Sequence, residues 1–359
     1  MIKLGILGSG IITGFHFFAL ERIKGARVAA IASADEASGR AAADKCKARF
    51  YGDYRELLDR EKGLNGIIVA LPNYMHCEAC AYAINAGHKN ILCEKPLGIN
   101  SAESGELVGL VEKTGVMLQT AYMKRFNPGF AKIKEALGHI GRIEFITSNI
   151  FLSSPEPDAK AASANGAKAP VSWHNDAGLS GGGILTHSGS HHLDLLRYLF
   201  GEIETVSCRC RYDAESGRDH YLSGTLGMGC GADVTMRIGH VDVPDLGPDW
   251  KVYKGGWNES VEVIASKGYI RAENPTWQGY APMKVTSWFS GMPGPAETHY
   301  ECSEQWTNEL AAFVKSCGTG KLSEIASTAA DGYRVDLAIE AMRESDRQNG
   351  AKLGVNYKY

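Results

Sequence analysis

The first 121 residues alternate short apolar runs with helical patterns, and this alternation constrains the fold more than any other feature of the chain. Predicted strands lie at 2–7, 27–32, 49–51, 66–71, 90–93 and 116–121. Predicted helices lie at about 11–24, 36–47, 54–60, 76–86 and 101–114. Strand–helix–strand units of this spacing form right-handed crossovers on a parallel sheet, and continuous apolar strands are typical of a sheet covered on both faces. The fold class is therefore α/β, with a doubly wound Rossmann domain over residues 1–121.

The remaining residues, 122–359, have a different pattern. Long segments rich in Val, Ile, Thr and Tyr predict strands at 142–152, 203–212, 220–242, 259–272 and 283–289. Helices are predicted at 128–137, 305–317 and 326–348, and residues 153–172 are rich in Ala, Ser and Pro and predict a surface loop. This pattern is typical of a second, α+β domain with a large, mostly antiparallel sheet. A chain of 359 residues is long enough for two such domains.

Composition excludes several classes of partner. The formal net charge of -3 gives no reason to expect nucleic acid or an anionic membrane surface. No stretch reaches the roughly 20 apolar residues of a membrane span, and the N-terminal run lacks a secretory cleavage pattern, so we expect a cytoplasmic protein. The nine cysteines are then expected to be reduced, and we interpret the Cys77–Cys80 pair as helix packing.

A glycine-rich turn follows the first predicted strand. Gly8 permits a tight turn, Gly10 permits close approach of the backbone to a pyrophosphate, and the helix that begins with Ile11 and Ile12 supplies its N-terminal amides. The third position of the motif is Thr13 rather than Gly or Ala. Placed between a strand and a helix, the turn predicts a dinucleotide site.

The end of the second strand bears on the choice of cofactor. An acidic residue there would hold the ribose hydroxyls of NAD, but this position is Ser33. A serine tolerates a 2′-phosphate better than a carboxylate does, and Arg40 is close enough in sequence to reach one. The cofactor is therefore NAD or NADP, with a slight preference for NADP.

Two further clusters indicate chemistry at or beyond the carboxyl ends of strands. Glu94 and Lys95 follow a strand and precede a proline, where a lysine cation can stabilise a developing alkoxide. The second cluster begins with three glycines at 181–183 and continues with His187, His191 and Asp194 at i, i+4 and i+7. A general acid/base histidine on that helix face fits a proton transfer that accompanies hydride transfer. A zinc pair of His187 and His191 is the weaker alternative, because no third ligand is evident.

These segments together resemble the Gfo/Idh/MocA oxidoreductases, which act on sugars, cyclitols and related compounds. The resemblance rests on GILGSGIITGFH, ALPNYMHCEACAYAINAG, CEKPL, AYMKRFNPGF and GGGILTHSGSHHLDLLRYLFG, and it extends over nearly the whole chain. It implies that Lys95 is the catalytic lysine and His191 the general acid/base. His187 stands where the family usually has Asp, and we expect it to act in catalysis and to bind substrate hydroxyls.

The resemblance and the residue patterns together define the remaining candidate residues. The cofactor-binding candidates are Gly8, Gly10, Ile11, Ile12, Ser33, Arg40, Leu71, Pro72, Asn73, His76, Glu94 and Lys95. The substrate-binding candidates are Tyr122, Arg125, Asn127, Trp173, His174, His187 and His191, with Lys124 beside them. No metal is expected.

The predicted function is transfer of hydride between NAD(P) and a secondary hydroxyl or keto carbon of a sugar, sugar derivative or cyclitol. One alternative is cleavage of a glycoside through transient oxidation to a keto-sugar, because some relatives with a histidine near position 187 work in this way. A second alternative is a non-catalytic sensor of a dinucleotide or sugar. The resemblance further implies a homodimer or homotetramer.

Overall fold

The computed structural model describes residues 1–153, 173–241, 257–275 and 281–357. In the first sheet the strand order is β15-β6-β5-β4-β1-β2-β3. Its strands are β1 (Ile2–Leu7), β2 (Ala26–Ala32), β3 (Arg49–Tyr51), β4 (Gly66–Val69), β5 (Asn90–Cys93), β6 (Met117–Thr120) and β15 (Ser327–Thr328). All pairings are parallel except that of β15 with β6. The predicted Rossmann arrangement is thus confirmed.

The helices of this part follow the sequence pattern closely. They are α1 (Ile11–Leu20), α2 (Glu36–Cys46), α3 (Tyr54–Arg60), α4 (His76–Asn85) and α5 (Ser101–Thr114). Local signals set their ends: Asp35 accepts from the Ser38 amide at the start of α2, and Gly115 ends α5 in the left-handed conformation. Helix α1 is shorter than predicted, because the chain turns after Leu20 to enter β2.

The second sheet has the order β14-β13-β12-β11-β7-β10-β9-β8-β16 and is mostly antiparallel, as predicted. Its strands are β7 (Ile143–Ser153), β8 (Ile203–Tyr212), β9 (Asp219–Met228), β10 (Asp233–Val241), β11 (Trp257–Ala265), β12 (Gly268–Asn274), β13 (Met283–Phe289), β14 (Ala296–Tyr300) and β16 (Leu353–Gly354). The segments 220–242 and 259–272, each predicted as one strand, are hairpins. Gly231 and Gly268 both have positive φ at or beside these turns.

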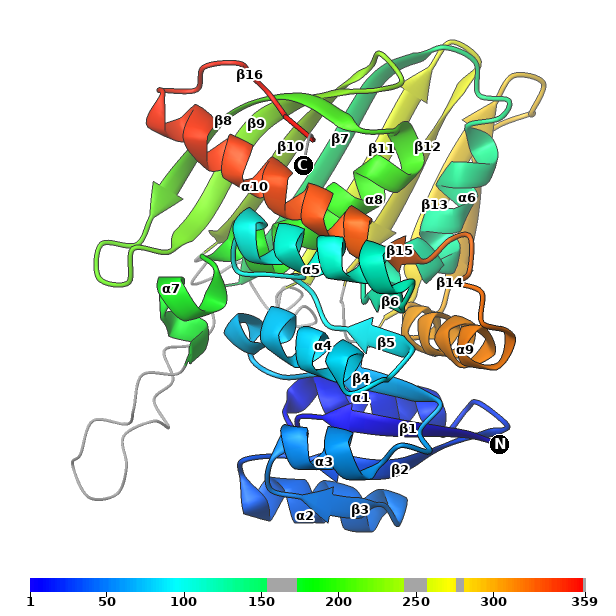
Figure 1. The fold of residues 1–359 in the computed structure, drawn as a ribbon. Coiled ribbons are helices and arrows are strands. Elements are labelled where there is room, and N and C mark those ends of the chain that lie inside the picture. Colours follow the sequence, from blue (N-terminus) through cyan, green and yellow to red (C-terminus); the bar gives the residue numbers. More distant parts are fainter. Residues whose placement is uncertain (154–172, 242–256, 276–280, 358–359) are drawn as a thin grey trace.

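Helices cover one face of the second sheet (Figure 1). They are α6 (Pro128–Ala136), α8 (Ser190–Phe200) and α10 (Ala329–Arg347), and their apolar faces share one core with the inward residues of the strands. Helix α10 also packs on α5, so it connects the two sheets. In the described residues, no helix is long and apolar enough to cross a membrane.

A late segment of the chain returns to the first sheet. Trp306, Leu310 and Phe313 of α9 (Glu304–Thr319) share a core with Leu4 and Ile6 of β1, and β15 pairs with β6. Strands β1 to β6 of the first sheet therefore precede the proposed boundary at residue 121/122, but β15 and α9 follow it and complete the Rossmann sheet and core.

Candidate active site

The loop between β1 and α1 has the shape that a dinucleotide pyrophosphate needs. Gly8 has a φ of +110°, and a Cβ at this position would lie 2.2 Å from the Ala70 carbonyl oxygen. Thr13, the departure from the motif, donates from Oγ1 to the Gly8 carbonyl at 3.0 Å and so braces the turn. The space beside Gly10 is open, and Gly10 caps α1 without a side chain. Ile11, the first residue of α1, is 83 % exposed, and the N-terminal amides of a helix are a favourable place for phosphates to bind.

Hydroxyl groups, rather than a carboxylate, gather at the end of β2. Ser9 Oγ lies 2.7 Å from the hydroxyls of both Ser33 and Ser38. The nearby Asp35 carboxylate accepts from the Ser38 amide at 2.9 Å and is used as a helix cap. Arg40 is paired with Glu36 on the surface of α2.

The segment after β4 connects the two parts of the molecule. Asn73 Nδ2 donates to the Ser180 carbonyl at 2.8 Å, and the His76 ring lies between the carbonyl oxygens of Pro96 (2.7 Å) and Leu71 (2.8 Å). Both side chains are buried. Asn73 and His76 thus hold the loop that contains Leu71 and Pro72 by binding backbone, and the cofactor contacts predicted for these four residues stay predictions.

Glu94 and Lys95 point to different surroundings. The Glu94 carboxylate lies 3.0 Å from His16 Nε2, and both groups are buried. Lys95 Nζ donates to the His187 carbonyl at 2.9 Å, across the two parts of the molecule. Burial lowers the pKa of Lys95 to about 8. The lysine is therefore a cation whose proton is held more weakly than usual.

Each of the three glycines at 181–183 has other protein atoms in the place that a side chain would occupy. A Cβ on Gly182 would meet the Arg343 guanidinium, and one on Gly183 would lie 1.9 Å from the Asp219 carbonyl oxygen. The Asp219 carboxylate accepts from the amides of Gly183 (3.0 Å) and Leu185 (2.6 Å). Protein atoms therefore occupy the space that a side chain at either position would need.

The two predicted catalytic histidines come next in the chain. His187 lies in a π-helical turn (Leu185–Gly189) and His191 in the first turn of α8. Burial, followed by the Lys95 cation, holds the pKa of each imidazole well below its usual value, so both rings are neutral at pH 7. His187 Nε2 and His191 Nδ1 are buried without a hydrogen-bond partner among the described residues. Buried nitrogens of this kind are uncommon, and a bound ligand with hydroxyl groups would satisfy them.

The side chains of Trp173 and His174 lie beside His187. The rings of Trp173 and His174 stack at 3.6 Å, and the centroid of His174 is 5.6 Å from that of His187. Tyr122 is fully buried and packs edge-on against His191 at 5.9 Å. Tyr122 therefore positions the His191 ring.

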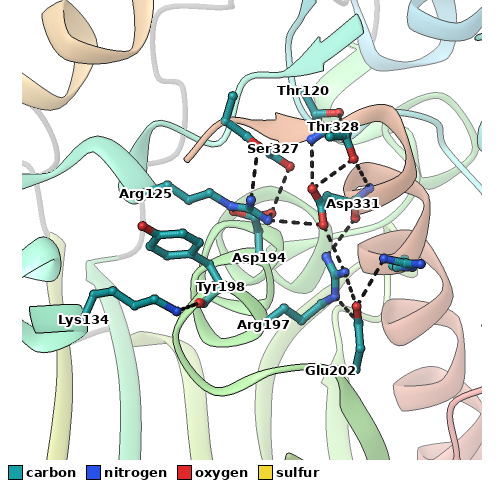
Figure 2. Close-up of polar contacts among 12 residues, drawn as sticks. Thr120, Arg125, Lys134, Asp194, Arg197, Tyr198, Glu202, Ser327, Thr328 and Asp331 are labelled. Carbon is teal, nitrogen blue, oxygen red and sulfur yellow. Dashed lines mark hydrogen bonds and ion pairs between the residues drawn. The ribbon is translucent and has the colours of Figure 1, made fainter. Parts of the chain in front are cut away.

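Asp194, Arg125 and Asn127 have partners inside the protein, and substrate binding by Arg125 and Asn127 stays a prediction. Arg125 donates to both oxygens of Asp194, at 2.7 and 2.6 Å, and Ser327 donates to the same carboxylate at 3.0 Å (Figure 2). Asn127 is fully buried and accepts from the Gly129 amide at the start of α6. These polar groups are satisfied inside the protein. The π-helical turn inserts an extra residue before α8 and shifts Asp194 away from the face of His187.

Lys124 is likewise fully buried and is paired with Glu259 of β11. His192 lies between Glu259 (3.1 Å) and the Ser148 hydroxyl (2.6 Å). Although burial opposes ionisation of Glu259, Lys124 and His192 hold its pKa below the usual value. The sequence analysis missed Glu259, because nothing in the pattern of an alternating strand marks one inward carboxylate.

Arg218 was also missed. It precedes β9 and donates to Asn175 Oδ1 at 3.0 Å and to the Gly182 carbonyl at 3.4 Å, beside the glycine turn. No sequence motif surrounds it. Within the described ranges there is no group of three or more His, Cys, Asp or Glu side chains arranged to hold a metal.

Comparison with known proteins identifies the family of this chain. Residues 2–122 match the model of an oxidoreductase family with an NAD-binding Rossmann fold, and residues 130–271 match the Gfo/Idh/MocA C-terminal domain. An uncharacterized oxidoreductase of Rhizobium meliloti is 30% identical over 249 residues, which cover 66% of this chain and 68% of that protein. Inositol 2-dehydrogenase 2 of Saccharopolyspora erythraea is 26% identical and covers 96% of this chain, with 93% of its own length matched.

Solved structures share the whole fold. A levoglucosan dehydrogenase in complex with NADH superposes with a TM-score of 0.83 at 20% identity, over 99% of each chain. The phosphate loop, the lysine after β5 and the histidines at the start of α8 lie within the matched segments. The chain is an enzyme that belongs to the Gfo/Idh/MocA family of NAD-dependent oxidoreductases.

Proposed function

We propose that this enzyme transfers hydride between NAD(P) and a secondary hydroxyl or keto carbon of a sugar, sugar derivative or cyclitol. The observation that carries the proposal is the 2.9 Å contact from Lys95 Nζ to the His187 carbonyl, beside the unpartnered nitrogens of His187 and His191. A cation and a neutral imidazole near one point are the groups needed to remove a hydroxyl proton. The names of the relatives, inositol and levoglucosan dehydrogenases, support a carbohydrate-like substrate.

In the direction of oxidation, His191 accepts the hydroxyl proton and the Lys95 ammonium stabilises the alkoxide that forms. The Lys95 charge also lowers the proton affinity of His191, which keeps the base neutral. His187 orients neighbouring hydroxyls. A nicotinamide bound through the Gly8–Gly10 turn would supply the acceptor of the hydride.

We further propose a slight preference for NADP over NAD. Support comes from the serine hydroxyls at the end of β2 and from the use of Asp35 as a helix cap. A cytoplasmic location remains a prediction.

A second candidate is glycoside cleavage through transient oxidation, and His187 in place of the usual Asp favours it. Mass spectrometry of the denatured protein, followed by turnover assays with NAD⁺ and NADP⁺, separates the candidates. We expect little retained dinucleotide and net NAD(P)H production from sugars or cyclitols. Near-stoichiometric retained NAD(H), with release of an aglycone and no net reduction of added cofactor, would favour the glycosidase. Tight cofactor binding without turnover of any substrate would instead indicate a sensor.

We also propose that the enzyme is a homo-oligomer through the uncovered face of the second sheet. Phe145, Ile264, Tyr269 and Trp288 are cross-strand neighbours in register on β7, β11, β12 and β13, so they form one row. Phe145 is 66 % exposed and Trp288 is 48 % exposed, which is unusual for contiguous apolar side chains. We expect a dimer or tetramer in sedimentation at micromolar concentration, and a monomer would contradict the proposal.

A further inference from the structure

Two side chains in the described surroundings of His187 are cationic, Lys95 and Arg218, whereas the imidazole of His174 is neutral because burial lowers its pKa. Lys95, His174, Arg218 and His240 all lie close enough to His187 to lower its pKa, as burial also does. Two acidic groups of neighbouring segments are used elsewhere: Glu94 pairs with His16, and Asp219 accepts from two backbone amides and pairs with Arg343. An anion that entered this region would reduce the repulsion among these groups.

Arg218 differs from the other arginines that are shielded from solvent. In the part of the chain that the structure describes, the remaining buried or half-buried arginines each form an ion pair with a carboxylate; they are Arg125, Arg197, Arg271, Arg334 and Arg343. Arg218 is half-buried, but it donates only to neutral oxygens, those of Asn175 and Gly182. A guanidinium shielded from solvent is most stable when its N–H groups donate to an anion that lies in the guanidinium plane.

The hydrogen-bond partners of Arg218 place its guanidinium near the proposed catalytic residues. Asn175, its partner, follows directly after Trp173 and His174, whose rings stack and reach His187. Gly182, its second partner, begins the turn that leads to His187, and the His187 carbonyl accepts from Lys95. Arg218 and His174 thus border the region in which Lys95, His187 and His191 converge.

We infer that the substrate is an anionic sugar, either a sugar acid or a sugar phosphate, and that Arg218 with His174 binds its charged group. This inference rests on the proposed oxidoreductase function and narrows its substrate class. Arg218 then determines specificity by binding the anion, while Lys95 and His191 act on a hydroxyl elsewhere in the same molecule. A neutral polyol would leave the guanidinium without a charged partner.

The first test measures binding without turnover. The melting temperature of the cofactor-loaded enzyme is recorded with gluconate, glucuronate, glucose 6-phosphate, glucose and myo-inositol. We expect stabilisation by at least one sugar acid or by the sugar phosphate, and the better of these two classes identifies the anion. The shift should be lost in Arg218→Gln and partly kept in Arg218→Lys. Stabilisation by neutral compounds alone would overturn the inference.

The second test uses kinetics and a matched control. Arg218→Gln should raise KM for the anionic substrate by about 10- to 100-fold, the usual effect of a lost charged hydrogen bond, with kcat little changed. Arg237→Gln is the control, since Arg237 also donates to an asparagine oxygen, at 2.9 Å, but on the exposed surface of β10. Equal effects of the two variants, or an unchanged KM, would refute the role of Arg218.

The two proposals fail in different ways. If neutral sugars are oxidised and anionic ones neither bind nor react, the function stands and the inference about charge is wrong. If anionic sugars stabilise the wild type and not Arg218→Gln, yet no compound is oxidised or reduced, the anion site stands and the oxidoreductase proposal is wrong.

Discussion

Replacing Lys95 by alanine is expected to lower kcat/KM by about 10²- to 10⁴-fold, while dinucleotide binding is retained. The physical reason is the loss of the Lys95 ammonium, which donates to the His187 carbonyl at 2.9 Å. In the described structure, no other ammonium contacts the backbone of residues 187–191, the segment that carries His187 and His191. The phosphate loop around Gly8 does not depend on Lys95, so fluorescence titration with NAD(P)H should give a similar Kd. Unchanged turnover would remove Lys95 from the mechanism.

The pH profile of the same reaction gives a second measure of Lys95. Burial lowers its pKa to about 8, so the ammonium is lost as the pH rises through that value. Because the protonated form is the active one, kcat/KM for oxidation should fall above about pH 8. His191 is neutral over the same range, since its pKa lies well below the usual value. In Lys95→Arg the side chain stays charged, and the falling limb should disappear even if the rate is lower. A limb that persists in Lys95→Arg belongs to another group.

Replacing Lys124 by methionine is expected to lower the free energy of unfolding by about 3–5 kcal/mol. This is the usual cost of leaving one partner of a buried ion pair without its counter-charge. Lys124 and Glu259 are both fully buried, and the carboxylate would then face only His192 and Asn274. Urea denaturation followed by circular dichroism measures the change.

Two controls separate charge from packing. Lys132→Met removes a lysine from the exposed pair with Glu135 and should cost about 0–1 kcal/mol. The double variant Lys124→Met/Glu259→Gln should recover part of the loss, because it removes the unpaired charge and keeps a side chain that can accept from Asn274. If the double variant is no more stable than Lys124→Met, the cost comes from the shape of the side chain and the electrostatic explanation fails.

The elements that the sequence predicted well are those with local causes. The strands and helices of residues 2–121 lie within a few residues of their predicted bounds, because apolar periodicity, the Asp35 cap and the Gly115 stop act over a few neighbouring residues. The two hairpins at β9–β10 and β11–β12 were each predicted as one strand. The apolar alternation continues across a short turn, so the pattern alone does not show where the chain reverses.

The candidate site divides in the same way. Gly8, Lys95 and His191 were assigned from motifs, since each motif encodes a local geometry: a positive φ, a strand end or a helix start. Arg125, Asn127 and His76 were assigned to ligands because they lie in the same segments, yet their partners are Asp194, the α6 amides and two backbone carbonyls. Those partners are distant in sequence or belong to the backbone, and no spacing rule identifies them.

The sequence by itself determined the Rossmann and antiparallel sheets and the phosphate loop. It also determined the presence of a lysine and histidines with acid–base chemistry. These features were predictable because periodicity, glycine conformation and helix capping depend on neighbouring residues. Only the tertiary structure decided which charges are used and which remain available. It paired Lys124 with Glu259 and Arg125 with Asp194, brought α9 back to the first sheet, and gave Arg218 neutral hydrogen-bond partners beside the histidines in the part of the chain that the structure describes. These outcomes depend on desolvation and on contacts between residues far apart in the chain, which a linear pattern does not record.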